Sequence, residues 1–507
     1  MSRNRQSKIF GFLGTSKYTK AKIMVGAKQQ QRYLLKSAGK TKIVATLEPY
    51  NEDYSQIEAM VGSIIDGIRL DLTVGNNQLR AKQVDWINKA AKKQGKNLAI
   101  IMDLPGLDVR LGNFDGVIEV KKGQTIVLAE NADYVQTGII PLMKDLSPLV
   151  KRGERLLMFD GRVKAVVNSV KDGAVFAEAV SDGILIKYKN IVLPDSRLRE
   201  RLVTPEDKRA LLFASTMNID FVTLNLTRSA DDVNQFKRLL SSMNFRCGVI
   251  AKIQDKAGIN NLEEITQTAD MVMFSPEALI TGSTVRFEKL PLLQQEVILT
   301  GQRYATPTII STRMFVGLGS DLEAARGESA MVASAVMSGC DSILLNDVAA
   351  SGNQPLEAIK TIGRIVDYYA KKPLSERPAD VRSLLVHGEK ARTDVMASGI
   401  IGLAKSLKAD IVIMAKTPEA AINLAAQREE GVRLIAVANS SACVNRLKLV
   451  YGVEPYLKPP ATNNDFKLNE LLLSKQLVAP GELIVEVSSE SPGVIGPLDT
   501  LKIREVN

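Results

Sequence analysis

The stretch GIRLDLTVGNNQLRAKQVDWINKAAKKQGKNLAIIMDL (67–104) decides the fold. It begins and ends with a short apolar run, and the segment between the runs carries apolar residues at helical spacing. Two buried strands joined by an amphipathic helix make a parallel β-α-β unit. The fold class therefore depends on how often this unit recurs.

The unit recurs along most of the chain. Eight apolar runs predict strands, namely TKIVATL from Thr41, GIRLDL from Gly67, LAIIMDL from Leu98, DFVTLNL from Asp220, CGVIAKI from Cys247, MVMF from Met271, PTIIST from Pro307 and DSILLN from Asp341. Amphipathic segments such as NLEEITQTA and KLPLLQQEVILTGQ separate them. Eight strand and helix units predict an α/β protein with a (β/α)8 TIM barrel.

One interval departs from this rhythm. Between the third run and Pro205, about a hundred residues show strand-type alternation and turn signals, as in RGERLLMFDGRVKAVV. We expect an inserted all-β domain in the third loop of the barrel. That loop opens at the carboxyl ends of the strands, where barrel active sites lie, so the insert is expected to act as a lid.

A proline-bearing linker, KPLSERP (372–378), follows the last barrel helix. Beyond it the pattern predicts a C-terminal α/β domain, with strands near Ser383, Asp410, Val432 and Glu482. We therefore expect a basic extension at 1–40, a barrel at 41–107 and 198–372, a β lid at 108–197 and an α/β domain at 373–507.

The charge of the chain is concentrated at one end. The net charge is +10, and Met1–Lys40 holds ten basic residues and no acidic ones, so the rest balances to zero. The body is therefore not a basic, nucleic-acid-coating protein. Three interpretations of the arm stay open: a transit peptide, a phosphate-binding arm, or a helical extension that docks on an acidic partner or nucleic acid.

Composition excludes several other classes. With 45% hydrophobic and 24% charged residues, the chain is neither disordered nor collagen-like. The three cysteines are widely spaced and form no CxxC pair, which favours a reducing compartment. No apolar run is long enough to span a membrane. We expect a cytoplasmic protein, or an organellar one if the arm is a transit peptide. A single histidine leaves almost no material for a histidine-rich zinc site or a Ser/His/Asp triad.

Six motifs stand at the expected strand ends, namely TKIVATLEP (41–49), GIRLDLTVG (67–75), MDLPGLDVR (102–110), AKIQDKAGI (251–259), IISTRM (309–314) and RGESAMVASAVMSGCDSILLNDVAASGNQPLEA (326–358). These motifs resemble the strand ends of the pyruvate kinase family. Their order and spacing hold from Thr41 to the C-terminus. The resemblance implies the family reaction, in which phosphoenolpyruvate passes its phosphoryl group to ADP, giving pyruvate and ATP in glycolysis.

The resemblance also implies which residues are inherited. The positions matching family residues that meet phosphate or substrate are Arg69, Arg110, Lys252 and Thr312. Asp71, Thr73 and Asp103 match positions that would form an oxygen-lined site for a monovalent cation such as K+. Asp160 matches a lid aspartate on the nucleotide side.

The divalent-metal site departs from the family pattern. Gln254 and Ala278 stand where the family has the Glu and Asp that bind Mg2+. An amide offers at most one neutral oxygen and a methyl group offers none, whereas Mg2+ prefers charged oxygens. Glu277 replaces a glycine of the family next to the substrate carboxylate, where it would repel an anion.

Three hypotheses follow. The first is a pyruvate kinase homologue that is inactive or impaired and needs no cofactor, kept as a structural or regulatory subunit of a homo- or hetero-oligomer, a tetramer with itself or an active paralogue. The second is an active enzyme whose rearranged site binds Mg2+ through Asp255 and Glu277, with K+ retained. The third is a module that binds an anionic metabolite, a nucleic acid or a protein.

Overall fold

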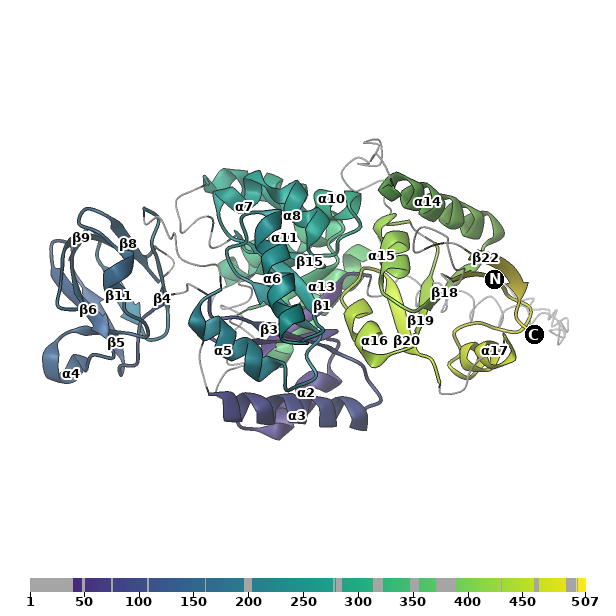
Figure 1. Cartoon of the computed structure of the whole chain (residues 1–507), viewed down its shortest axis with the longest axis horizontal. Helices are drawn as coiled ribbons and strands as arrows, with labels where there is room; N and C mark the ends of the chain where they lie inside the picture. The colour runs from purple at the N-terminus through teal and green to yellow at the C-terminus, as the bar shows by residue number, and fades with distance from the viewer. Residues whose placement is uncertain are drawn as a thin grey trace, which may run out of the picture.

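The computed structural model describes most of the chain in three domains. The described residues are 40–47, 51–73, 76–106, 109–159, 161–195, 203–276, 279, 285–312, 322–346, 355–370, 389–429, 431–459, 465–488, 498 and 500–507. The first 39 residues, and with them nearly all of the basic arm, lie outside this set. Figure 1 shows the barrel in the middle, the inserted domain on one side and the C-terminal domain on the other.

The predicted (β/α)8 barrel is confirmed, and each of the eight apolar runs forms a barrel strand. The strands close in the order β1-β17-β16-β15-β14-β13-β3-β2, and every neighbouring pair is parallel. They are β1 (Lys42–Leu47), β2 (Gly67–Asp71), β3 (Ala99–Asp103), β13 (Phe221–Leu224), β14 (Gly248–Ile253), β15 (Met271–Phe274), β16 (Thr308–Thr312) and β17 (Ser342–Leu345).

Helices surround the barrel. They are α2 (Tyr54–Gly62), α3 (Asn77–Lys93), α5 (Pro205–Ala214), α6 (Ala230–Ser242), α7 (Lys256–Asn260), α8 (Leu262–Thr268), α10 (Leu290–Arg303), α11 (Leu322–Met337) and α13 (Pro355–Ala370), with a 3-10 turn at η2 (Phe287–Lys289). Several begin at a side chain that caps the free N–H groups of the first turn. Thr204 before α5 and Ser229 before α6 each form a capping box with an aspartate three residues later. The chain thus fixes where each helix begins after its strand.

The interval after β3 forms β-sheets, as the strand-type alternation predicts. One sheet runs in the order β4-β12-β8-β9-β10-β6-β7 and a second pairs β11 with β5. The elements are β4 (Val109–Arg110), β5 (Val117–Val120), β6 (Thr125–Glu130), α4 (Tyr134–Thr137), β7 (Ile140–Leu142), η1 (Ser147–Leu149), β8 (Arg155–Met158), β9 (Val163–Lys171), β10 (Ala174–Ala179), β11 (Gly183–Ile186) and β12 (Asn190–Val192). This domain has its own apolar core.

The C-terminal domain is a five-stranded sheet in the order β20-β19-β18-β21-β22, with helices on both faces. Its elements are α14 (Glu389–Leu407), β18 (Asp410–Ala415), α15 (Glu419–Ala426), β19 (Leu434–Ala438), α16 (Ser441–Leu447), β20 (Val453–Leu457), α17 (Asp465–Ser474), β21 (Leu483–Ser488) and β22 (Thr500–Glu505). The strand expected near Ser383 lies outside the described residues.

A loop of the C-terminal domain closes the barrel at the amino-terminal ends of its strands. Leu449, just after α16, is fully buried in the apolar cluster of the barrel lumen beside Phe221 and Ile250. A Cβ on Gly67 would lie 3.0 Å from the Leu449 side chain, so this close approach favours glycine at the start of β2. The two domains therefore share one core.

A buried ion pair fastens the same junction. Arg428 donates to the Asp341 carboxylate at 2.6 Å and to the Gly339 carbonyl at 3.0 Å. The backbone N–H of Tyr451 donates to the other Asp341 oxygen at 3.0 Å. Because Arg428 and Asp341 are 8% and 2% exposed, these contacts are shielded from water and are expected to hold the domains firmly.

Candidate functional site

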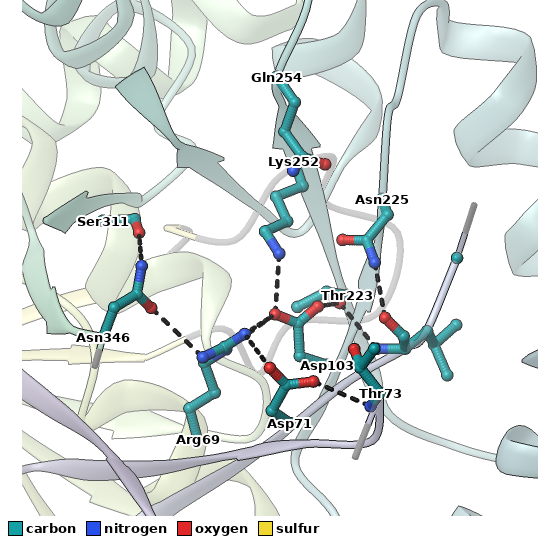
Figure 2. Close-up of polar contacts among 12 residues, drawn as sticks. Arg69, Asp71, Thr73, Asp103, Thr223, Asn225, Lys252, Gln254, Ser311 and Asn346 are labelled. Atoms are coloured by element: carbon teal, nitrogen blue, oxygen red, sulfur yellow. Dashed lines mark hydrogen bonds and ion pairs between the residues drawn. The ribbon is translucent and has the colours of Figure 1, made fainter. Parts of the chain in front are cut away.

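The barrel mouth carries a layer of polar side chains directly above the apolar lumen. Side chains alternate along a strand, so the residue two positions after an inward-facing one also faces inward. Ile101 and Ile250 belong to the lumen cluster. Asp103 and Lys252 follow them by two residues and therefore face the same lumen at its open end. Figure 2 shows these side chains converging there with Arg69.

Asp103 is the centre of this network. One oxygen accepts from Arg69 at 2.8 and 2.5 Å and from Lys252 Nζ at 2.8 Å. The other accepts from the Thr223 hydroxyl, which in turn accepts the backbone N–H of Leu104 at 3.2 Å. The carboxylate is almost completely buried. Both oxygens are thus bonded to groups of the protein itself.

Asp71 makes a similar set of contacts. Its Oδ1 accepts the backbone N–H of Thr73 at 2.9 Å. Its Oδ2 lies 3.3 Å from Arg69 and 3.5 Å from Arg110, which comes from strand β4 of the insert. Arg110 thereby links the insert to the barrel mouth.

Arg69 directs its whole guanidinium group at protein acceptors. Besides its contacts with Asp103 and Asp71, it donates to the Thr46 hydroxyl at 3.2 Å and to Asn346 Oδ1 at 3.3 Å. Five contacts match the five N–H groups that a guanidinium offers. The Asn346 amide donates to the Ser311 hydroxyl at 2.8 Å, which extends the network to strand β16. A ligand would have to compete with these acceptors for Arg69.

The electrostatics of the cluster follow from this pairing. Burial alone would raise the pKa of Asp103. The positive charges of Lys252 and Arg69 lower it by more than burial raises it, so the pKa lies below its ordinary value. For Asp71 the same opposition, with Arg69 and Arg110 as the nearby cations, gives a strongly lowered pKa. Both carboxylates are therefore ionised at neutral pH. Three cations against two carboxylates leave this group of five residues one positive charge, which favours an anion.

The residues beside Lys252 do not fit a divalent metal. The Gln254 side-chain oxygen accepts the backbone N–H of Leu226 at 2.9 Å, and its other polar group is a donor. Asp255 caps helix α7 through Gly258 N–H at 2.9 Å, and its second oxygen accepts from Arg228 at 2.8 Å. Among the described residues no three His, Cys, Asp or Glu side chains gather in a way that could hold a metal ion.

The expected monovalent-cation site does not fit its ion well either. The carboxylate oxygens of Asp71 and Asp103 are already bonded to arginine, lysine, hydroxyl or backbone N–H donors. The nearby Leu104 carbonyl accepts from the Asn225 amide at 2.6 Å. Each of these oxygens therefore already has a donor from the protein, and a cation would have to compete with it.

Some predicted site residues lie outside the described residues. These are Asp160, Glu277 and Ala278, and of Thr312 only the backbone is described, at the end of β16. The structure brings together Arg69, Asp71, Thr73, Asp103, Arg110 and Lys252. Sequence reasoning missed Thr46, Thr223, Asn225 and Ser311 as members of the network. Counting in steps of two from the buried strand residues would have found them, because the lumen side repeats with that period.

The comparisons with known proteins agree with the fold. The sequence pattern of the pyruvate kinase barrel domain matches residues 38–359, and that of the pyruvate kinase alpha/beta domain matches residues 394–504. The chain belongs to the pyruvate kinase family. Its polar layer lies at the carboxyl ends of the barrel strands, the face at which TIM-barrel enzymes have their active sites.

Individual pyruvate kinases are similar over most of their length. The pyruvate kinase of Corynebacterium glutamicum is 28% identical over 470 residues, covering 92% of this chain and 97% of that protein. Those of Staphylococcus aureus MRSA252 and Geobacillus stearothermophilus are each 26% identical, covering 92% of this chain and 80% of each relative. Within the described part of the chain, no helix combines the length and apolar character needed to cross a membrane.

Proposed function

We propose that this chain is a pyruvate kinase homologue that has lost metal-dependent phosphoryl transfer and retains an anion-binding barrel mouth. One observation carries the proposal: the side-chain oxygens of Gln254 and Asp255 are already bonded to groups of the protein. Gln254 holds the Leu226 backbone, and Asp255 holds a helix end and Arg228. A metal ion contributes several kcal/mol to charge stabilisation in such transfers, and each ~1.4 kcal/mol changes the rate tenfold.

The arrangement of Arg69 supports the same proposal. All its N–H groups are bonded to protein acceptors, so it stabilises the barrel mouth instead of meeting a substrate phosphate. Lys252 donates to Asp103 at 2.8 Å, and its ammonium carries three N–H groups in all. The anion site is therefore built around Lys252, with Arg110 from the insert nearby.

The experiment is a coupled assay of pyruvate formation from phosphoenolpyruvate and ADP with Mg2+ or Mn2+. We expect a turnover at least ~1000-fold below that of an ordinary pyruvate kinase. The double substitution Gln254→Glu with Ala278→Asp restores both carboxylates of the family and is expected to raise Mg2+-dependent turnover. Turnover at ordinary kinase rates by the unmodified chain would overturn the proposal.

The rearranged metal site of the second hypothesis is a separate candidate. It requires Asp255 to leave its helix cap and Arg228, at the cost of a charge-assisted contact of 2.8 Å. If the chain is active, Asp255→Ala and Glu277→Ala should each abolish turnover under that hypothesis. Activity that survives both substitutions would exclude it.

We also propose that the chain assembles into an oligomer, as a tetramer with itself or with an active paralogue. Exposed apolar side chains on the outer elements of the C-terminal domain support this, namely Val395 and Met396 on α14 and Leu501 and Ile503 on β22. Light scattering on the purified chain, alone and mixed with an active pyruvate kinase, tests it. A monomer in both samples would contradict it.

A further inference from the structure

Asn225 and Ser275 come from the strands on either side of Lys252, and each has a side-chain oxygen that the network does not use. Phe221 and Met273 belong to the lumen cluster. Ser275 directly follows β15, and because its backbone N–H still donates to the Ile253 carbonyl of β14, it continues the inward alternation from Met273. Asn225 directly follows β13, and Figure 2 shows its side chain beside Lys252 at the mouth. Their strands flank β14, since Leu224 pairs with Ala251 and Phe274 pairs with Ile253. With neighbouring strands ~4.8 Å apart, one small ligand on Lys252 would reach both.

Each of these side chains has an oxygen that is buried and unsatisfied. Within the described structure, neither Asn225 Oδ1 nor Ser275 Oγ has a hydrogen-bond partner. Ser275 is only 6% exposed. Native proteins rarely leave such atoms unpaired, because a buried polar group that lacks a partner costs its full desolvation penalty. These two oxygens therefore point to a missing group.

Asn225 is held in one orientation by its other end. Its amide nitrogen donates to the Leu104 carbonyl at 2.6 Å, which fixes the nitrogen and oxygen positions of the side chain. Gly106, in the left-handed region at φ +63°, would place a Cβ 3.0 Å from that nitrogen, so a glycine leaves room for the asparagine. Figure 2 shows the Asn225 oxygen on the side of the amide that faces Lys252.

The chemistry of the two oxygens defines the missing group. An amide oxygen only accepts hydrogen bonds, so Asn225 needs a donor, whereas the Ser275 hydroxyl is able to donate or accept. Lys252 and the one positive charge of the cluster need an anion. Ionised phosphoenolpyruvate has oxygens that accept but no hydroxyl that donates.

We propose that the barrel mouth binds a small anion that also carries a hydroxyl group, of the class of phosphorylated hydroxy acids, with the hydroxyl donating to Asn225 Oδ1. Lys252 binds the anionic group, and the Ser275 hydroxyl forms a hydrogen bond with the side of the ligand that faces away from Asn225. This inference rests on the proposed anion-binding function and adds a specificity that the family reaction does not require.

The test uses two probes that differ by one hydroxyl group, 2-phosphoglycerate and 2-phospholactate. Calorimetry with the full chain gives the ratio of their dissociation constants. Contacts to the phosphate and carboxylate groups, which both probes have, cancel in this ratio. We expect the unmodified chain to bind 2-phosphoglycerate roughly tenfold more tightly, the size of one well-formed hydrogen bond to a buried acceptor. Asn225→Leu removes the acceptor and should bring the ratio close to one.

A second variant keeps the test decisive if Asn225→Leu fails to fold. Asn225→Ser removes the amide oxygen but keeps a small polar side chain beside Gly106, and it should also bring the ratio close to one. As a matched control, Asn423→Leu makes the same substitution on helix α15, far from the barrel mouth, and should leave the ratio at ten.

Each outcome separates this inference from the proposed function. A ratio near one in the unmodified chain, with both esters binding, overturns the hydroxyl specificity and leaves the anion site standing. If neither ester binds, the anion site fails and the inference fails with it. Rapid turnover of phosphoenolpyruvate would overturn the loss of catalysis, while a ratio of ten would still support the hydroxyl contact.

Discussion

Asp103→Asn should destabilise the protein strongly, because Asp103 neutralises two buried cations. Its carboxylate lies 2.5 to 2.8 Å from Arg69 and 2.8 Å from Lys252, and its side chain is 2% exposed. At an effective dielectric constant of ~20, each pair interacts with ~6 kcal/mol before desolvation is subtracted. Removing one partner of a buried pair typically costs about 3 to 5 kcal/mol. Asparagine keeps an acceptor in place, so the lower end of that range is expected.

The assay is urea unfolding followed by the fluorescence of Trp86, which lies on α3 of the barrel and is the single tryptophan of the chain. The pH dependence gives a second readout. The folded pKa of Asp103 is below its ordinary value, so its stabilising contribution is present above that value, ~3.9, and is lost as the pH falls through the lowered pKa. The difference between the two proteins should therefore stay constant from pH 7 to pH 5 and shrink in stronger acid.

An exposed ion pair provides the matched control. Glu357→Gln breaks the contact with Lys360 on the surface of α13, where the two side chains are 49% and 63% exposed, and should leave the urea midpoint unchanged.

Added inorganic phosphate should stabilise Asp103→Asn more than the unmodified chain, because the variant has an additional uncompensated cation. An Asp103→Asn protein as stable as the unmodified chain would refute the view that this carboxylate holds the cluster together.

Three further outcomes are expected. Replacing K+ by tetramethylammonium should leave the affinity for 2-phosphoglycerate unchanged, since internal cations occupy the carboxylates of the expected monovalent site; a tenfold loss on calorimetry would contradict this. Arg428→Met should lower the free energy of unfolding by about 3 to 5 kcal/mol, measured by urea unfolding, because it leaves Asp341 buried without its cation; a loss below 1 kcal/mol would count against the ion pair as a fastening between domains. Burial raises the pKa of the Asp220 carboxyl to about 6. The stability that the protonated group contributes is therefore full below pH ~3.9, and about 3 kcal/mol of it is lost as the pH rises to 6. Asp220→Asn should flatten this part of the plot of unfolding free energy against pH, and an unchanged plot would show that Asp220 does not titrate there.

The barrel strands could be predicted from sequence because the lumen imposes strong patterns. Runs such as LAIIMDL and MVMF are apolar on both faces, as parallel strands covered by helices must be. In the C-terminal domain, β20 and β22 were missed. Strand β20 contains Pro455 and lies at a sheet edge, and β22 is the other edge with mostly exposed residues, so neither shows the apolar pattern of a central strand.

The site was predictable to the extent that its residues are charged and end strands. Arg69, Asp103 and Lys252 could be assigned to the barrel mouth from their motifs, and the structure brings them into contact. Which partners they take depends on geometry that a motif does not contain. The four residues that accept from Arg69 come from four different strands or their ends, so no local pattern reveals that its guanidinium is fully used. The motif likewise does not reveal the partner of Gln254, whose oxygen accepts the backbone N–H of Leu226 in the loop after β13.

The position of Leu449 in the barrel lumen has a consequence for synthesis on the ribosome. The last barrel strand, β17, ends at Leu345, so Leu449 emerges about a hundred residues later. At a synthesis rate of 5 to 20 residues per second, roughly 5 to 20 seconds pass between completion of β17 and synthesis of the side chain that closes the amino-terminal end of the barrel. During that interval the apolar layer around Phe221 and Ile250 is open to water and to chaperones. The nascent barrel is therefore completed only after most of the chain has been made.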